Sequence, residues 1–260
     1  GSREERTAAV AGLKKINRDT GVQLLLRSVQ TGSLEEKANG LEALSALGGD
    51  AARTQILHML RGAQDEELEL VETALRAAGT SEFLLNLASE VVADPKDKDG
   101  RMLLTLARIA GDRIVRPLVK QLHNPDLTLR ERTARALLQI KSEHVVAELT
   151  EEIQFGSLPY EDQAIQIVGQ IGGQRASEFL LECLSQGRAP GATIEALALL
   201  KEPAGLSALA RLSIQNAGEL PSEARRALKM VPGSIMLEQY ISLARGSDLD
   251  TRRQIGEAMG

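Results

Sequence analysis

Apolar residues along this chain follow the spacing of amphipathic helices. Ile114, Val115, Leu118 and Leu122 mark one such face, and Leu206, Leu209 and Leu212 mark another. Steps of three and four residues place these side chains on one side of a helix, whereas a strand would alternate every second residue. The pattern predicts an all-α protein.

Turn residues divide these helices into repeats. At regular intervals an apolar residue that ends a helical pattern is followed by a turn residue, and we call each such position a junction. The junctions are Ile16-Asn17, Leu47-Gly48, Ala78-Gly79, Ala110-Gly111, Ile140-Lys141, Ile171-Gly172, Leu200-Lys201 and Val231-Pro232. Successive junctions are 31, 31, 32, 30, 31, 29 and 31 residues apart. A second series lies between them, at Gly32, Gly62, Pro95, Pro125, Gly156, Gly187, Gly218 and Gly246. Two interleaved series with one period predict about eight helix pairs of about 31 residues each.

The second helix of each pair carries a small residue followed by leucine shortly before its junction. The pairs include Ala43-Leu44, Ala74-Leu75, Ala136-Leu137, Ala196-Leu197 and Ala227-Leu228. A small residue lets a neighbouring helix approach, and the leucine fills the core between stacked pairs. No linker interrupts the series, so residues 3–260 are expected to form a single solenoid domain.

Residues at the expected helix ends agree with this division. Ser33 and Glu36 form a capping-box pattern, and Asp126 stands where an N-cap belongs. Gly48, Gly79, Gly111 and Gly172 follow second helices, where left-handed backbone is favoured. The polar stretch 93–100 interrupts the regularity and is expected to be an exposed turn and a candidate hinge.

Composition narrows the class of protein. Only 2% of residues are aromatic, which suits the thin aliphatic core of a solenoid. The net charge of −5 gives no general attraction to nucleic acid or anionic membrane. Cys183 is expected in the core, and no apolar run approaches a membrane-spanning length, which favours a cytoplasmic location. Gly1-Ser2 is read as a cloning scar, and the rest as a fragment of a longer protein.

The fourth full repeat carries a family resemblance. Residues 112–137 combine Pro117 in the first helix, the turn Asn124-Pro125-Asp126, and Arg130 four residues after Asp126. This resembles the HEAT repeat, in the short form of bacterial HEAT-like and phycobilisome-lyase-type proteins. The resemblance implies a right-handed α-α superhelix with the second helices on its concave face, and macromolecular binding as its role. It also implies that Asp126 and Arg130 contact neighbouring repeats.

The sequence offers little for catalysis. His58, His123 and His144 lie in different repeats and none precedes glutamate, whereas HEAT-like hydroxylases use repeated His-Glu pairs around a di-iron centre. The glycines of 169–173 follow a helix, so they are no dinucleotide-binding loop. HEAT-like glycosylases and bilin lyases are weaker matches, because tryptophan is absent and no lyase residues map onto the chain. We therefore expect no cofactor, no metal and no enzyme activity.

Charge is banded along the chain. Residues 101–141 hold nine basic and three acidic side chains, between acidic segments of net −8 (35–100) and −7 (142–220). At 100° per residue, the residues 2, 5 and 9 positions before each junction lie on the face of the second helix opposite the core. We expect a protein or peptide partner there, contacting Arg76, Arg101, Thr105, Arg108, Arg135 and Gln166. The mixed sign of this face disfavours nucleic acid, but binding of nucleic acid by the 101–141 band stays an alternative, as does self-assembly.

Overall fold

The computed structural model describes residues 12, 18–47, 50–62, 65–78, 81–94, 97, 99–156, 158–215, 218–245 and 247–259. Within these residues the secondary structure is helical, and no strand occurs. The chain divides into two compact units, 1–140 and 141–260, whose boundary coincides with the predicted junction Ile140-Lys141. The predicted first junction, Gly1-Ser2, Gly48, Gly79 and Gly246 lie outside the described residues.

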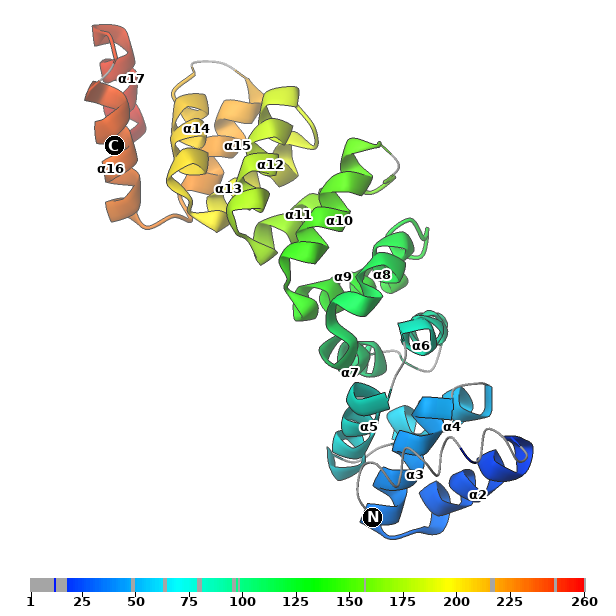
Figure 1. Cartoon of the computed structure of the whole chain (residues 1–260). Helices are drawn as coiled ribbons and strands as arrows, with labels where there is room; N and C mark the ends of the chain where they lie inside the picture. Colours follow the sequence, from blue (N-terminus) through cyan, green and yellow to red (C-terminus); the bar gives the residue numbers. More distant parts are fainter. Residues whose placement is uncertain are drawn as a thin grey trace. The chain divides into compact units, whose positions relative to one another are not determined.

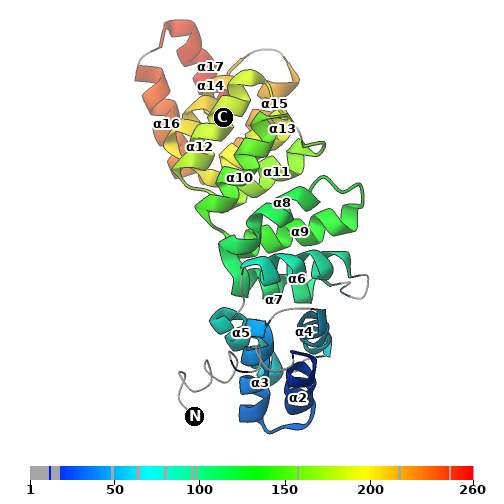
Figure 2. The ribbon, with the colours of Figure 1, turned by 45° about the vertical axis from the view of Figure 1, so that its right-hand side comes forward.

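In the unit of residues 1–140, the described part of the chain forms four helix pairs (Figure 1, Figure 2). They are α2 (Arg18–Thr31) with α3 (Leu34–Leu47), α4 (Asp50–Gly62) with α5 (Asp65–Ala78), α6 (Ser81–Ala93) with α7 (Arg101–Ala110), and the 3-10 helix η1 (Gly111–Ile114) and α8 (Val115–Gln121) with α9 (Leu127–Ile140). First helices pack on first helices of the next pair, and the second helices α3, α5, α7 and α9 pack in series. The unit therefore has two layers of stacked helices.

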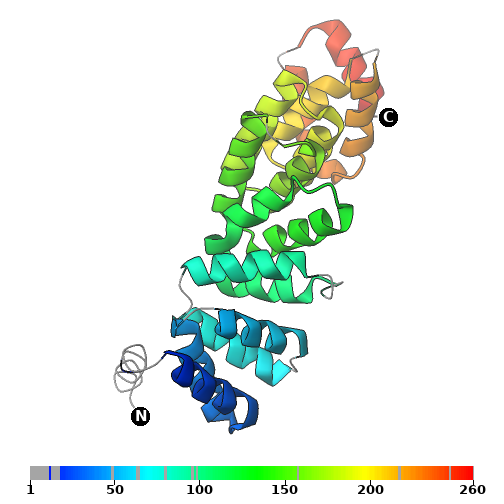
Figure 3. The ribbon, with the colours of Figure 1, turned by 90° about the vertical axis from the view of Figure 1, so that its right-hand side faces the viewer.

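The unit of residues 141–260 repeats this arrangement (Figure 3). Its pairs are α10 (Glu143–Gln154) with α11 (Glu161–Ile171), α12 (Gln174–Gln186) with α13 (Pro190–Leu200), α14 (Pro203–Ser213) with α15 (Glu219–Leu228), and α16 (Gly233–Arg245) with α17 (Leu249–Met259). The second helices α11, α13 and α15 again pack in series. The predicted all-α architecture of helix-pair repeats is confirmed in both units.

The core of each unit lies between its two layers. The leucines of the predicted small-large pairs, Leu44, Leu75, Leu137 and Leu197, have no exposed surface. First helices contribute side chains of the same kind, such as Leu118 in α8. Because one helix pair buries only part of its apolar surface, stacking of neighbouring pairs completes the core.

Most second helices end where the turn residues of the sequence predicted. Six second helices, α3, α5, α7, α9, α11 and α13, end at the residue that the junctions indicated; α15 ends three residues early, at Leu228, before a turn that reaches Val231. At Ser33, the backbone N–H donates to Glu36 Oε2 at 2.7 Å and the hydroxyl accepts from the Glu36 N–H at 3.4 Å. Hydrogen bonding of the Glu36 carboxylate to the backbone N–H and then to the side chain of Ser33 lowers the pKa of Glu36 from its ordinary value. The capping box is confirmed.

Left-handed backbone at the ends of second helices is not restricted to glycine. Gly111 and Gly172 have φ angles of 54° and 79°, as their positions predicted. Lys141 and Lys201 also have positive φ angles, of 47° and 57°, after α9 and α13. Lys201, with ψ of 21°, is in the left-handed helical region, whereas Gly111 and Gly172 have ψ angles of −133° and −163°. The termination geometry of the repeat thus overrides the steric cost that a Cβ atom carries in this region.

Close helix approach depends on small residues between α11 and α13. A Cβ atom added to Gly169 would lie 2.5 Å from Cβ of Ala196 and 2.9 Å from its Cα. Such distances leave no room for a methyl group, so the two backbones meet at this point. Ala196 is a residue of the small-large pattern, and its predicted role in close packing is confirmed here.

Among the described residues of the stretch 93–100, Asp94 and Asp97 differ from the expected exposed turn. Asp94 and Asp97 are 6% and 5% exposed, and both are anchored. The carboxylate of Asp97 accepts hydrogen bonds from the backbone N–H groups of Met102 and Leu103, at 3.1 and 3.2 Å, and so caps α7. Arg61 of α4 donates to Asp94 Oδ2 at 2.8 and 2.5 Å.

Arg132 of α9 also binds this stretch of the chain. Its buried guanidinium donates to the carbonyl of Val92 at 2.9 Å, to that of Asp94 at 3.4 Å, and to that of Asp97. Arg130, for which the resemblance implied contacts between repeats, donates to the carbonyls of Asn124 and Pro125 in its own turn. Arg132 therefore links α9 to the preceding repeat.

Candidate functional site

The predicted partner-binding residues gather mainly on the second-helix layer of residues 1–140. Arg76 lies on α5, Arg101 and Arg108 lie on α7, and Arg135 lies on α9. All four side chains are exposed, and α7 packs against both α5 and α9. The amphipathic pattern of three separate helices thus produces one polar surface, which we call the α5–α7–α9 surface.

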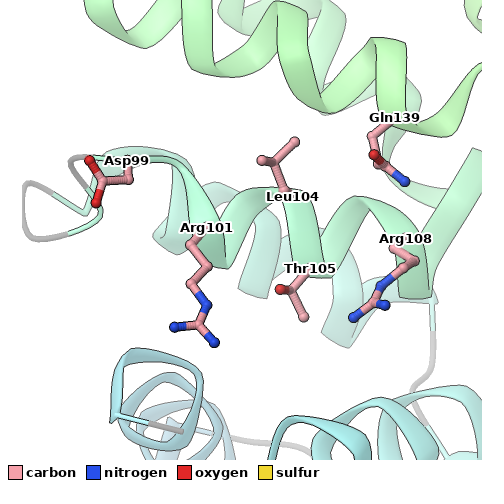
Figure 4. Close-up of a pocket in the computed structure, with 6 residues that line it drawn as sticks. All are labelled: Asp99, Arg101, Leu104, Thr105, Arg108 and Gln139. Atoms are coloured by element: carbon pink, nitrogen blue, oxygen red, sulfur yellow. The ribbon is translucent and has the colours of Figure 1, made fainter. Parts of the chain in front are cut away.

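A hollow of about 320 Å³ lies on this surface. Its lining residues are Asp99, Arg101, Leu104, Thr105, Arg108 and Gln139. Arg101, Thr105 and Arg108 extend from the same side of α7, and Gln139 comes from α9 (Figure 4). Three of the six predicted residues therefore line one concavity.

Glu72 of α5 organises the arginines at one end of the surface. Its carboxylate forms an ion pair with Arg108 and lies 3.8 Å from Nη2 of Arg76. The Glu72 side chain is only 15% exposed, whereas those of Arg76 and Arg108 are 58% and 52% exposed. One carboxylate between two guanidinium groups leaves this cluster with an excess of positive charge.

Thr105 is the residue whose surroundings differ from the sequence prediction. It was expected on the open face of α7, but it is 7% exposed. Packing of α7 between α5 and α9 covers the middle turn of the helix, where Thr105 lies between Arg101 and Arg108. Thr105 therefore lines the hollow but is almost entirely buried.

Two other predicted residues have distinct positions. Arg135 is exposed and its guanidinium donates to the backbone carbonyl of Asp99 at 3.4 Å, a long hydrogen bond. Gln166 is exposed on α11, which belongs to the unit of residues 141–260. The α5–α7–α9 surface is therefore defined by the other five residues.

The basic band 101–141 is divided between the two helix layers. Arg101, Arg108 and Arg135 lie on second helices, whereas Arg116 and Lys120 lie on the first helix α8. Arg130 and Arg132 are buried, at 8% and 5% exposure, and bind backbone carbonyls. The positive charge that is contiguous in sequence does not form one stripe on the folded surface.

Sequence reasoning missed several residues of this site. Glu72 was part of an acidic run, and only its spacing of four residues before Arg76 indicated an ion pair. Asp99 and Gln139 enter the hollow from the loop before α7 and the last turn of α9, and no local pattern marks them. Their participation depends on the packing of neighbouring repeats.

The remaining sequence predictions concern metal ligands, membrane spans and the single cysteine. Among the described residues, no group of three or more His, Cys, Asp or Glu side chains is arranged to hold a metal ion. None of the helices in the described parts of the chain has the length and apolar character needed to cross a membrane. Cys183 is buried as predicted, and burial raises its pKa to about 11.

Two solved structures align with most of this chain, both at TM-scores below 0.5. No family model matches the sequence, and no curated protein matches it. The alignment with an engineered protein covers 92% of this chain and 77% of the engineered chain, at 18% identity and a TM-score of 0.35. Human deoxyhypusine hydroxylase in complex with glycerol aligns with 95% of this chain and 98% of its own, at 16% identity and a TM-score of 0.32.

Proposed function

We propose that this protein is a non-enzymatic scaffold or adaptor that binds a protein partner through its second-helix layer. The observation that carries the proposal is the α5–α7–α9 surface, where Arg101 and Arg108 of α7 line a hollow of about 320 Å³ and exposed arginines also lie on α5 and α9. Stacked repeats create such extended surfaces because each repeat adds an equivalent helix to the same layer.

The mixed polarity of this surface favours a protein over a nucleic acid. Glu69, Glu72 and Glu131 lie on the same second helices as the arginines. A phosphate backbone requires a run of basic contacts, and carboxylates within that run repel it. A polypeptide carries groups of both signs together with apolar side chains, so it matches this composition better.

Capture of partners from source lysate by two matched variants tests the proposal. Arg101→Glu with Arg135→Glu alters the α5–α7–α9 surface, and Arg116→Glu with Lys120→Glu places the same charge change on α8 of the other layer. Both variants are first compared with the parent by circular dichroism and thermal melting, so that unfolding is recognised.

The proposal predicts that a partner captured by the parent is also captured by the variant with Arg116→Glu and Lys120→Glu. The same partner should be lost by the variant with Arg101→Glu and Arg135→Glu. Loss from both variants would indicate a general charge effect, and retention by both would place binding elsewhere. Recovery of nucleic acid in place of protein, with binding that falls steeply as salt rises, would favour the alternative of a nucleic-acid-binding protein.

A further inference from the structure

We propose that the α7 hollow binds an extended acidic segment of the partner, with two carboxylates three residues apart placed on Arg101 and Arg108. The inference rests on the proposed function and adds the chemistry of the ligand. It follows from the spacing of the two arginines, the lining of the hollow and the ion pair that Glu72 already makes there.

The spacing of the arginines matches an extended peptide. Arg101 and Arg108 are seven residues apart on α7, so their Cα atoms are ~10.5 Å apart along the helix axis. In the polyproline II conformation, residues i and i+3 point the same way and are ~9 Å apart. The flexible arginine side chains absorb the remaining difference, and both extend from the same side of the helix (Figure 4).

The lining of the hollow suits the residues between the two carboxylates. Leu104 and Thr105 lie between the arginines and offer an aliphatic side chain and a small hydroxyl-bearing one. A volume of about 320 Å³ accommodates a few side chains and is small for a whole helix. These features favour a short peptide segment over a folded surface.

Glu72 shows how a carboxylate is accepted at one end. It pairs with Arg108 and approaches Arg76, so the cluster already binds one acidic group and keeps a net positive charge. Asp99 lines the other end, beyond Arg101, and its carboxylate repels further acidic residues there. The two ends therefore favour a bounded acidic motif over a long polyanion.

The test measures the binding of labelled peptides to the 260-residue chain. Fluorescence anisotropy and amide chemical shifts are both recorded, so that weak complexes are detected. The first peptide carries glutamate at every third position in a proline-rich background, and the second replaces each glutamate with glutamine. Labelled oligouridine serves as the nucleic-acid probe. The parent is compared with Arg101→Gln plus Arg108→Gln, and with the control Arg116→Gln plus Lys120→Gln.

The inference predicts that the glutamate peptide binds and the glutamine peptide does not. The Arg101 and Arg108 variant should bind about tenfold more weakly, as expected for two lost ion pairs, and the α8 control should match the parent. Glu72→Gln should strengthen binding about threefold, because it removes a competing carboxylate from Arg108. A purely structural role of Glu72 would not produce this gain.

Other results would overturn the inference. Equal binding of the peptide by all variants, or weaker binding by Glu72→Gln, would remove the hollow as the site. Tighter binding of oligouridine than of the peptide would assign the surface to nucleic acid. If no peptide shifts any resonance while Arg101→Glu with Arg135→Glu still loses a captured partner, the acidic motif is wrong and the proposed function stands.

Discussion

Replacing Arg132 with methionine is expected to destabilise the unit of residues 1–140 more than any change on its exposed surface. The guanidinium is 5% exposed and donates to the backbone carbonyls of Val92, Asp94 and Asp97. Methionine retains most of the aliphatic stem, which packs within reach of Gly100, but it donates no hydrogen bond. The substitution therefore separates the anchoring bonds from the packing.

The magnitude follows from the bonds that are lost. An acceptor left unsatisfied in the interior costs about 1–3 kcal/mol. The bond to Asp94 is long, at 3.4 Å, and the carbonyl of Asp97 also accepts the Gly100 N–H at 3.1 Å. We therefore count only the carbonyl of Val92 as left unsatisfied, which gives a loss of about 1–3 kcal/mol. Arg135→Met, one turn further along α9 and exposed, should change stability by no more than about 0.5 kcal/mol.

Two measurements check this prediction. Urea denaturation of both variants, followed by circular dichroism, compares their midpoints with that of the parent. Hydrogen exchange of the Met102 and Leu103 amides reports on the cap that Asp97 provides to α7. Similar small effects of Arg132→Met and Arg135→Met, with unchanged protection of these two amides, would refute the role assigned to Arg132.

Three further predictions concern packing and the buried thiol. Leu137→Ala should lower the free energy of unfolding by about 2–5 kcal/mol, because it truncates a core side chain. A loss as small as that of an exposed substitution would show that Leu137 does not lie on the core face of α9. Gly169→Ala should destabilise by about 1–3 kcal/mol through overpacking against α13. In the control Gly191→Ala the new Cβ meets nothing closer than 3.6 Å, so this change should stabilise the protein by about 0.5–1 kcal/mol. If urea titrations showed both substitutions changing the free energy of unfolding in the same direction, the close contact between Gly169 and Ala196 would be contradicted. Because the pKa of Cys183 is raised from 9.0 to about 11, its thiolate fraction at pH 8 falls roughly 100-fold, so labelling by a thiol reagent should be slow until urea exposes it; rapid labelling of the native protein would disprove burial.

The sequence was most informative about the helices themselves. The ends of α5, α7 and α11 were predicted to the residue, because glycine and apolar periodicity act locally. The capping box at Ser33 and Glu36 was predicted for the same reason, since both partners lie within one helical turn. The exposed arginines of α7 and α9 also followed from helical periodicity.

Contacts between repeats were harder to predict from the sequence. Residues 93–100 read as a polar turn, yet Asp94 and Asp97 are buried, because Arg61 and Arg132 reach them from positions 33 and 35 residues away in the chain. Thr105 was expected on an open face, and packing of α5 and α9 on either side of α7 covers it. Such outcomes depend on side chains from different repeats meeting in space.

The sequence by itself determined an all-α chain of helix pairs, the places where the helices end, and the side of each helix that is apolar. Those properties depend on residues within a turn or two of one another, which share a helix and its caps. Only the tertiary structure decided which polar residues meet. It joined Glu72 to Arg108, brought Asp99 and Gln139 to one hollow, and made Arg132 an anchor, because stacking sets distances that no local spacing records.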